Sequence, residues 1–136
     1  MTTATIQEVT TQARFNNALK TIRKVGITTR LNVSSCCAGC VILPENTAIL
    51  WTFGGQDSAF SWFEGTMVNR NVLAKAKRRG YNINIESITR ARGIEKEVYF
   101  KFTDIIAAEA AQLAFEAEGF EVEWDGTDIQ CVIVKM

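Results

Sequence analysis

The sequence predicts an α+β protein, a two-layer sandwich in which an antiparallel-rich sheet carries its helices mainly on one face. Three helix-like segments are apolar on one side only, which is typical of helices that pack against a sheet. Most strand-like segments alternate apolar and polar residues, which indicates strands with one face in a core. The 136 residues are enough for one domain, which is expected to span residues 1–136.

Three helices are expected. The first begins with Thr5 and Glu8, which have the spacing of a capping box, and it ends at Gly26. A second helix is expected from about residue 66 to residue 80, and a third from about residue 104 to residue 118. The apolar stripe of the third helix is expected to consist of Ile106, Ala110, Leu113, Ala114 and Ala117.

The strands expected before the third helix cover residues 27–33, 47–53, 81–86 and 97–102. Residues 47–53 are apolar on both faces and are therefore expected to form a central strand. Residues 81–86 alternate, and they are expected to pair with residues 97–102 through a turn around residues 91–93. Residues 56–65 are expected to form a loop whose aromatic side chains cover the core.

The chain is expected to end in a hairpin formed by residues 120–124 and 129–133. Its turn is Asp125-Gly126, one of the strongest short-range signals for a hairpin. If the hairpin loop has either two or four residues, odd-numbered residues of strand 129–133 lie on the same face as even-numbered residues of strand 120–124. Cys131 is therefore expected to point into the core.

Histidine is absent, which excludes Ser-His-Asp and Cys-His nucleophile systems and every histidine metal site. The start of the chain lacks the pattern of a signal peptide, and no run of about 18 apolar residues is present to span a membrane. These features predict a cytoplasmic protein that makes no membrane contact, and they favour a binding protein over an enzyme.

Three of the four cysteines, Cys36, Cys37 and Cys40, are close together in the sequence. Cys37 and Cys40 form a C-x-x-C pair, whose spacing lets two thiolates bind one tetrahedral ion or exchange a disulfide. One interpretation is a zinc site formed by the thiolates of Cys36, Cys37, Cys40 and Cys131. Two alternatives are small buried thiols in a tight loop, and a redox or catalytic pair at Cys37 and Cys40.

The formal net charge of zero conceals two oppositely charged halves. Residues 1–92 contain 12 basic and 5 acidic residues, whereas residues 93–136 contain 3 basic and 10 acidic residues. Most of the positive excess comes from Arg70, Lys75, Lys77, Arg78, Arg79, Arg90 and Arg92. These residues are a candidate phosphate-contacting patch for nucleic acid. The alternatives are a solvated helix end, and head-to-tail self-association of the two oppositely charged surfaces.

Three segments resemble a bacterial and phage-borne family catalogued as a domain of unknown function. That family has a Phe-x-Cys-Cys-x-x-Cys-Gly stretch, a strand leading into Gln-Asp, and a helix followed by a Val-Glu-Trp-Asp-Gly hairpin. The similar segments here are residues 33–40, 48–57 and 113–126. The chain departs from the family in having Val41 in place of the glycine. The resemblance implies a shared fold and a shared cysteine loop, and it implies no activity.

The function expected from these observations is that of a small non-enzymatic binding or regulatory protein. The resemblance is to bacterial as well as phage-borne proteins, so either origin fits the expected cytoplasmic location. A phage-encoded protein would act in the host cytoplasm or in the virion. It is expected to act through a protein partner or self-association, with a cysteine loop that either holds structural zinc or binds no cofactor. One alternative is a thiol-dependent redox protein or enzyme that uses Cys37 and Cys40. Another is a self-assembling phage component or a nucleic-acid-binding accessory protein.

Overall fold

Helices and strands are interspersed along the computed structural model, which describes residues 10–33, 48–55 and 58–136. Thr10 caps the first helix by accepting a hydrogen bond from the backbone N–H of Ala13 at 3.0 Å. The elements are, in chain order, α1 (Thr11–Lys24), β1 (Thr28–Val33), β2 (Ile49–Phe53), β3 (Phe60–Phe63), β4 (Thr66–Asn69), α2 (Arg70–Arg78), α3 (Ile85–Arg90), β5 (Glu97–Phe102), α4 (Ile105–Ala117), β6 (Glu121–Glu123) and β7 (Val132–Lys135).

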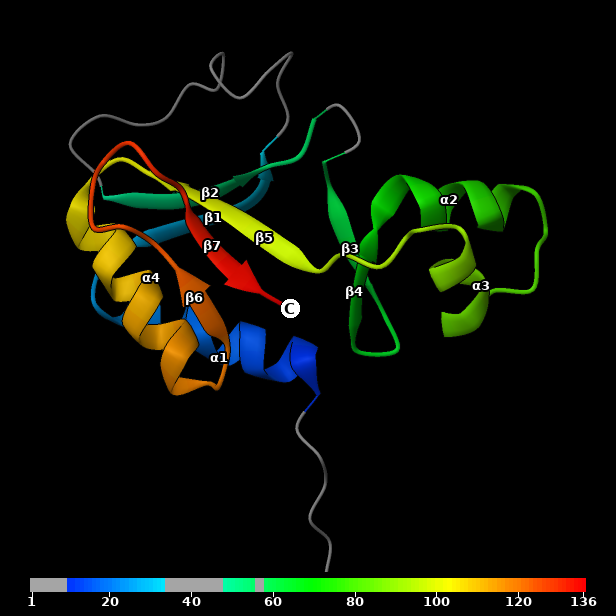
Figure 1. Cartoon of the computed structure of the whole chain (residues 1–136), viewed down its shortest axis with the longest axis horizontal. Helices are drawn as coiled ribbons and strands as arrows, with labels where there is room; N and C mark the ends of the chain where they lie inside the picture. The colour runs from blue at the N-terminus through cyan, green and yellow to red at the C-terminus, as the bar shows by residue number, and fades with distance from the viewer. Residues whose placement is uncertain (1–9, 34–47, 56–57) are drawn as a thin grey trace, which may run out of the picture.

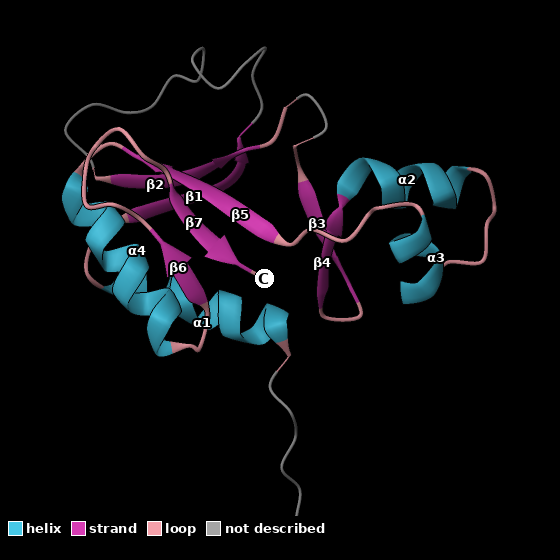
Figure 2. Cartoon of the chain, viewed as in Figure 1, coloured by secondary structure: helices cyan, strands magenta, loops and turns pink. Residues whose placement is uncertain are grey.

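Five strands form the main sheet, in the order β1-β2-β5-β7-β6 (Figure 1). The β1–β2 pair is parallel, and the other three neighbouring pairs are antiparallel. Helices α1 and α4 pack against each other and cover one face of this sheet (Figure 2). The predicted α+β class, with an antiparallel-rich sheet and helices mainly on one face, is therefore confirmed.

The main core lies between this sheet and the two helices, and aromatic rings fill its centre. Phe15 of α1 is fully buried, with its ring centroid 6.0 Å from that of Phe100 and 5.3 Å from that of Phe115. Alternation along β7 turns Val132 and Val134 to the same side, and both are fully buried. Full burial of one large apolar side chain stabilises a fold by about 1.5–3 kcal/mol.

Residues 60–94 form a second part of the molecule, which we call the small unit (Figure 1). It consists of the β3–β4 hairpin, α2 and α3, and it has an apolar centre formed by Val68, Leu73 and Ile88. One side of the hairpin also reaches the main core, because Phe60 is buried in the same cluster as the rings of α1 and α4. The packing of the small unit is therefore continuous with that of the main sheet.

Asn32, near the end of β1, joins the small unit to the sheet through its side chain. Its amide Nδ2 donates to the carbonyl oxygen of Phe60 at 2.9 Å, and its Oδ1 accepts from the N–H of Phe60 at 3.1 Å. Its own backbone N–H donates to Thr52 Oγ1 at 2.8 Å, and its φ of 55° lies in the left-handed region. A Cβ on Gly54 would lie 2.5 Å from the Asn32 carbonyl carbon, so this contact requires glycine.

The strands predicted at residues 27–33, 47–53 and 97–102 and the helix predicted at about 104–118 are confirmed as β1, β2, β5 and α4. Strand β2 is buried on both faces, as expected of a strand inside the sheet. The first helix ends close to Gly26, as predicted. Its predicted start at Thr5 lies outside the described residues.

The second helix is shorter than predicted, because its first four expected residues form β4. Asn69 sets the true start of α2, since its side chain accepts from the N–H groups of Asn71 and Val72. The expected loop at residues 56–65 was also wrong where the structure describes it, because β3 lies there. Glu64 and Gly65, with φ of 49° and 78°, form the two-residue turn between β3 and β4.

The strand predicted at residues 81–86 is wrong, because part of this segment is the start of α3. The side chain of Asn84 accepts from the N–H of Ser87 at 2.8 Å, and the Ser87 hydroxyl accepts from the N–H of Asn84 at 3.0 Å. This capping box begins a helix in a segment whose apolar residues alternate. Strand β5 pairs instead with β2 and β7.

The apolar stripe predicted for α4 is mostly wrong. Ile106 and Leu113 are 64% and 69% exposed, and of the five predicted residues only Ala114 is buried. The buried face of α4 consists of Ala107, Ala108, Ala111, Ala114 and Phe115. Small alanines let α4 lie close to α1 and to the sheet, and the bulky Phe115 ring fills the remaining space in the core.

The C-terminal hairpin has a wider connection than predicted, and this changes which face Cys131 occupies. Glu123 pairs with Ile133, so residues 124–131 connect β6 to β7. Asp125 Oδ1 accepts from both the N–H and the hydroxyl of Thr127, which closes a local turn within this connection. Even-numbered residues therefore face the core on both strands. Cys131 is half-buried outside β7 and does not point into the core.

We predict that Asn32→Gly lowers the free energy of unfolding by about 1–3 kcal/mol, because it keeps the left-handed backbone but removes both hydrogen bonds to Phe60. Chemical denaturation followed by tryptophan fluorescence measures the loss. Asn16→Ala, on the exposed side of α1, is the matched control and should change stability by less than about 0.5 kcal/mol. Equal effects of the two substitutions would show that the Asn32 contacts contribute nothing.

Candidate functional site

All seven predicted basic residues lie on the small unit, and the fold brings four of them together. Lys75 and Arg78 belong to α2, Arg79 follows it directly, and Arg92 lies in the turn after α3. Residues three and four positions apart lie on the same face of a helix, which places Arg78 and Arg79 beside Lys75. Arg92 reaches the same surface because α3 packs next to α2.

These four cations line two adjoining hollows. The first, which we call the polar hollow, has a volume of about 480 Å³. Its lining residues are Asn69, Asn71, Val72, Lys75, Arg78 and Arg92. The second, which we call the tyrosine hollow, has a volume of about 290 Å³ and contains Arg79 and Tyr81. Lys75 and Val72 line both hollows, so the two form one continuous surface.

The surface is strongly positive because, among the residues that the structure describes, four cations and no carboxylate line the two hollows. Glu86 and Glu95, the acidic residues on either side of Arg92 in the sequence, already have partners. Glu86 pairs with Arg90 at 3.6 Å on the exposed side of α3, and Glu95 accepts from Asn69 Nδ2 at 3.2 Å. Among the described residues, no salt bridge neutralises Lys75, Arg78, Arg79 or Arg92. These four charges are therefore available to an anionic ligand.

The remaining predicted basic residues do not join this surface. Arg70 and Lys77 are exposed on α2 but line neither hollow. Lys77 is two positions from Lys75, which turns it toward the opposite side of the helix. Arg90 faces Glu86. The sequence shows where the basic residues are concentrated along the chain, whereas the fold determines which of their side chains converge.

Tyr81 is a residue of this surface that the sequence analysis missed. The sequence predicts Tyr81 to be the first residue of the strand at residues 81–86, but Tyr81 is 59% exposed and lines the tyrosine hollow with Lys75 and Arg79. The sequence contained a usable signal, because Tyr81 directly follows Arg78-Arg79-Gly80. A basic run that ends in glycine and an aromatic residue is typical of a helix end with the aromatic ring folded back.

The cysteine site falls largely outside what the structure describes. Cys36, Cys37 and Cys40 lie in residues 34–47, which are not among the described residues. Cys131 is a free thiol that lines a shallow hollow with Trp51 and Lys101. Within the described ranges, no group of three or more metal-binding side chains occurs. The zinc site and the redox pair therefore stay predictions.

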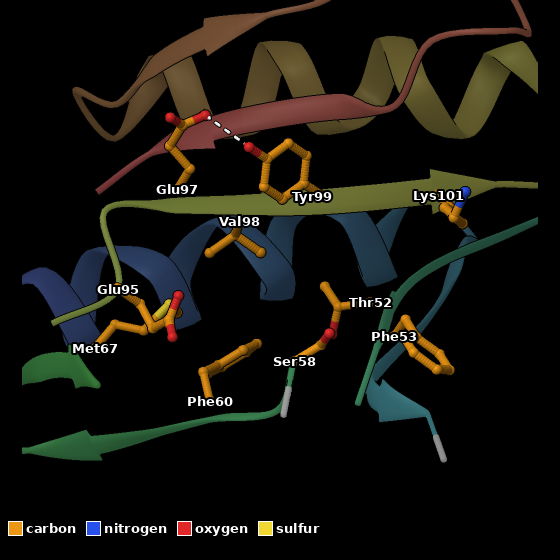
Figure 3. A pocket seen from close by; sticks show the side chains of 10 residues that line it. All are labelled: Thr52, Phe53, Ser58, Phe60, Met67, Glu95, Glu97, Val98, Tyr99 and Lys101. Atoms are coloured by element: carbon orange, nitrogen blue, oxygen red, sulfur yellow. Dashed lines mark hydrogen bonds between the residues drawn. The ribbon is translucent and has the colours of Figure 1, made fainter. Parts of the chain in front are cut away.

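A further cavity of about 420 Å³ lies between β5 and the β3–β4 hairpin (Figure 3). Its walls include the apolar side chains of Phe60, Met67 and Val98. Figure 3 shows Glu97 and Tyr99 projecting from β5 on the side opposite to Val98, so their polar ends point away from Glu95. Among the described lining residues, the acidic groups do not converge on one point, and the cavity offers no acid–base pair.

Glu97 and Tyr99 belong instead to a polar network on the outer face of the sheet. The Tyr99 hydroxyl donates to Glu97 Oε2 at 3.3 Å, and Lys135 Nζ lies 3.6 Å from Glu97 and 3.4 Å from Glu123. The charge of Glu97 raises the pKa of Tyr99, with a further contribution from burial. Burial alone would lower the pKa of Lys135, but hydrogen bonds and charge attraction from Glu123 and Glu97 raise it.

We predict that Glu97→Gln lowers the pKa of Tyr99 toward its ordinary value, because the carboxylate no longer opposes the tyrosinate charge. Absorbance at about 295 nm follows tyrosinate formation, near pH 10 for an ordinary tyrosine, and Tyr81→Phe in both proteins isolates the signal of Tyr99. With a folded pKa above the unfolded one, protonated Tyr99 contributes stability that is lost as pH rises through the folded pKa. An unchanged titration midpoint in Glu97→Gln would contradict this assignment.

In the described part of the chain, no helix is long and apolar enough to cross a membrane. Comparison of the chain with known protein families, with curated proteins and with solved structures finds no match. Its function must therefore be inferred from its own residues.

Proposed function

We propose that the protein is a small non-enzymatic accessory protein that binds nucleic acid through the small unit. The supporting observation is the convergence of Lys75, Arg78, Arg79 and Arg92 on two adjoining hollows, whose described lining residues include no carboxylate. These residues come from separate stretches of the chain, so the positive surface is a product of the fold. A nucleic-acid backbone presents repeated phosphates, which is the ligand chemistry that a continuous row of cations fits.

The side chains of this surface suit phosphate chemically. Arginine presents a planar fork of N–H donors that can hold two phosphate oxygens at once, and lysine adds a compact point charge. Arg78 and Arg92 line the polar hollow from two different elements, with Lys75 beside them. A phosphate in this hollow would therefore meet cations from more than one side, without a large rearrangement of the backbone.

The acidic residues of the main sheet unit are concentrated in one region, which would repel a polyanion there. The small unit, residues 60–94, contains seven basic and two acidic residues, whereas residues 104–123 contain six acidic residues and no basic residue. Helix α4 and strand β6 carry these acidic groups, and they lie on the main sheet away from the small unit (Figure 1). A formal net charge of zero is thus compatible with local binding of nucleic acid.

A second candidate function is head-to-tail self-association, which the exposed face of α4 favours. Ile106 and Leu113 are largely exposed on a helix whose only charged residues are Glu109 and Glu116. Seven positions separate these two apolar residues, so they form one stripe beside acidic groups. A second copy of the chain offers complementary chemistry through its basic small unit. Such an interface is heterologous and would build rings or filaments.

We predict that the double substitution Lys75→Ala with Arg78→Ala weakens binding of a single-stranded oligonucleotide of about 20 nucleotides at least tenfold. Each lost phosphate contact should also reduce the steepness of log K against log salt by about 0.7 for a single strand. Fluorescence anisotropy over a series of salt concentrations measures both quantities. Circular dichroism checks that α2 remains folded.

Lys77→Ala is the matched control for this experiment, because Lys77 is exposed on the same helix but lines neither hollow. It should weaken binding by about threefold or less, since it removes only diffuse charge. A loss for Lys77→Ala as large as that for Lys75→Ala with Arg78→Ala would mean that the hollows do not form the binding site. A wild-type protein without affinity for the oligonucleotide at low salt would contradict the proposed function.

We predict that Ile106→Ser with Leu113→Ser abolishes concentration-dependent association of the protein, because it removes the apolar stripe of α4 without altering charge. Sedimentation velocity over a range of protein concentrations measures the effect. Oligonucleotide binding should be retained in this variant, since the small unit is untouched. A wild-type protein that sediments as a monomer at every concentration would rule out the second candidate.

A further inference from the structure

The backbone fixes Tyr81 at the end of α2. Gly80, with φ of 70°, reverses the chain there, and its N–H donates to the carbonyl oxygen of Lys77 at 3.2 Å. The N–H of Tyr81 donates to the carbonyl oxygen of Ala76 at 3.1 Å. These two bonds are those of a Schellman motif, which folds the chain back against the last turn of a helix. The exposed Tyr81 ring is therefore held beside α2.

The tyrosine hollow has an apolar floor and a cationic rim. Val72, Ala76 and Ile88 are among its apolar lining residues, and Lys75 and Arg79 are its charged ones. Its volume of about 290 Å³ lies at the lower end of the range for small-ligand pockets, which suits one planar group. Apolar surface beside an exposed aromatic ring and two cations fits a flat, uncharged ring attached to an anionic group.

Few side chains in this hollow can distinguish one such ring from another. The hydroxyl of Ser87 also lines the hollow, but it donates to the carbonyl oxygen of Asn84 at 2.9 Å and accepts from the N–H of the same residue. Its hydrogen-bonding capacity is thus largely committed to the capping box of α3. Contact through stacking and apolar surface tolerates any base, because every base has a planar face.

We infer that Tyr81 is a stacking platform for one unpaired base, so that the ligand of the small unit is single-stranded nucleic acid bound without sequence preference. This inference rests on the proposed function and names its ligand. Lys75 lines both hollows, so phosphates held in the polar hollow place the adjacent base at Tyr81. In a duplex the faces of the bases are already stacked on each other and are not offered to a side chain.

The test compares Tyr81→Ala and Tyr81→Phe with the wild-type protein. The probes are a fluorescent deoxythymidine oligonucleotide of about 20 nucleotides and a DNA hairpin duplex of matched charge. Tyr81→Ala is expected to weaken single-strand binding about tenfold at every salt concentration, without changing the salt dependence, because it removes an uncharged contact. Tyr81→Phe should retain wild-type affinity, since the ring remains. Duplex binding should be the same in all three proteins.

Tyr99→Ala is the matched control, because Tyr99 is 54% exposed but lies on the outer face of β5. It should leave single-strand binding unchanged. Equal affinity of Tyr81→Ala and wild type for the single strand would overturn the stacking role, as would an equal loss on the duplex. The proposed function would survive that result if Lys75→Ala with Arg78→Ala still weakened binding. It would fail separately if wild-type protein bound neither probe.

Discussion

Two hydrogen bonds between the Asn32 amide and the backbone of Phe60 fix the first strand of the small unit to the main sheet. The Asn32 side chain takes the place of a peptide group beside β3, so the hairpin is attached to the end of β1 as though it were one more strand. Strand β4 runs directly into the Asn69 cap of α2. The Asn32 contact therefore helps to position the hairpin that leads into α2, and with it Lys75 and Arg78 of the positive surface.

The main sheet could be predicted because its signals are periodic and its burial is one-sided. In β5 and β7, every second residue is apolar and buried in the core, and the residues between them lie on the outer face. The buried residues are Val98, Phe100, Val132 and Val134. The small unit gave no such signal, because its elements are short and begin at side-chain caps. Asn69 ends a strand and starts a helix, and Asn84 starts a helix inside an alternating segment. At both positions, the hydrogen bonds of the asparagine side chain determine where a helix begins, and the periodic pattern of apolar residues does not.

Part of the candidate site could likewise be predicted from the sequence, and part could not. The basic residues were evident from composition, but their convergence depends on packing between α2 and α3, where a Cβ on Gly93 would lie 2.7 Å from Val72 Cγ1. Tyr81 was misassigned because its segment was taken for a strand. The apolar pattern of α4 predicts the wrong buried face. Phe115 and four alanines are buried, whereas the larger Ile106 and Leu113 are exposed. Small residues that permit close approach carry little weight in a hydrophobicity pattern.

The separation of charge between the small unit and the α4–β6 surface has a kinetic consequence. A molecule with no net charge but with opposite charges at separate places has a dipole moment, and the field of a polyanion exerts a torque on it before contact. A protein that binds nucleic acid would approach it with the α4–β6 surface turned away, which raises the fraction of encounters that are correctly oriented. Because the net charge is zero, a polyanion attracts the whole molecule only weakly at long range. This charge distribution therefore improves the orientation of encounters and not their frequency.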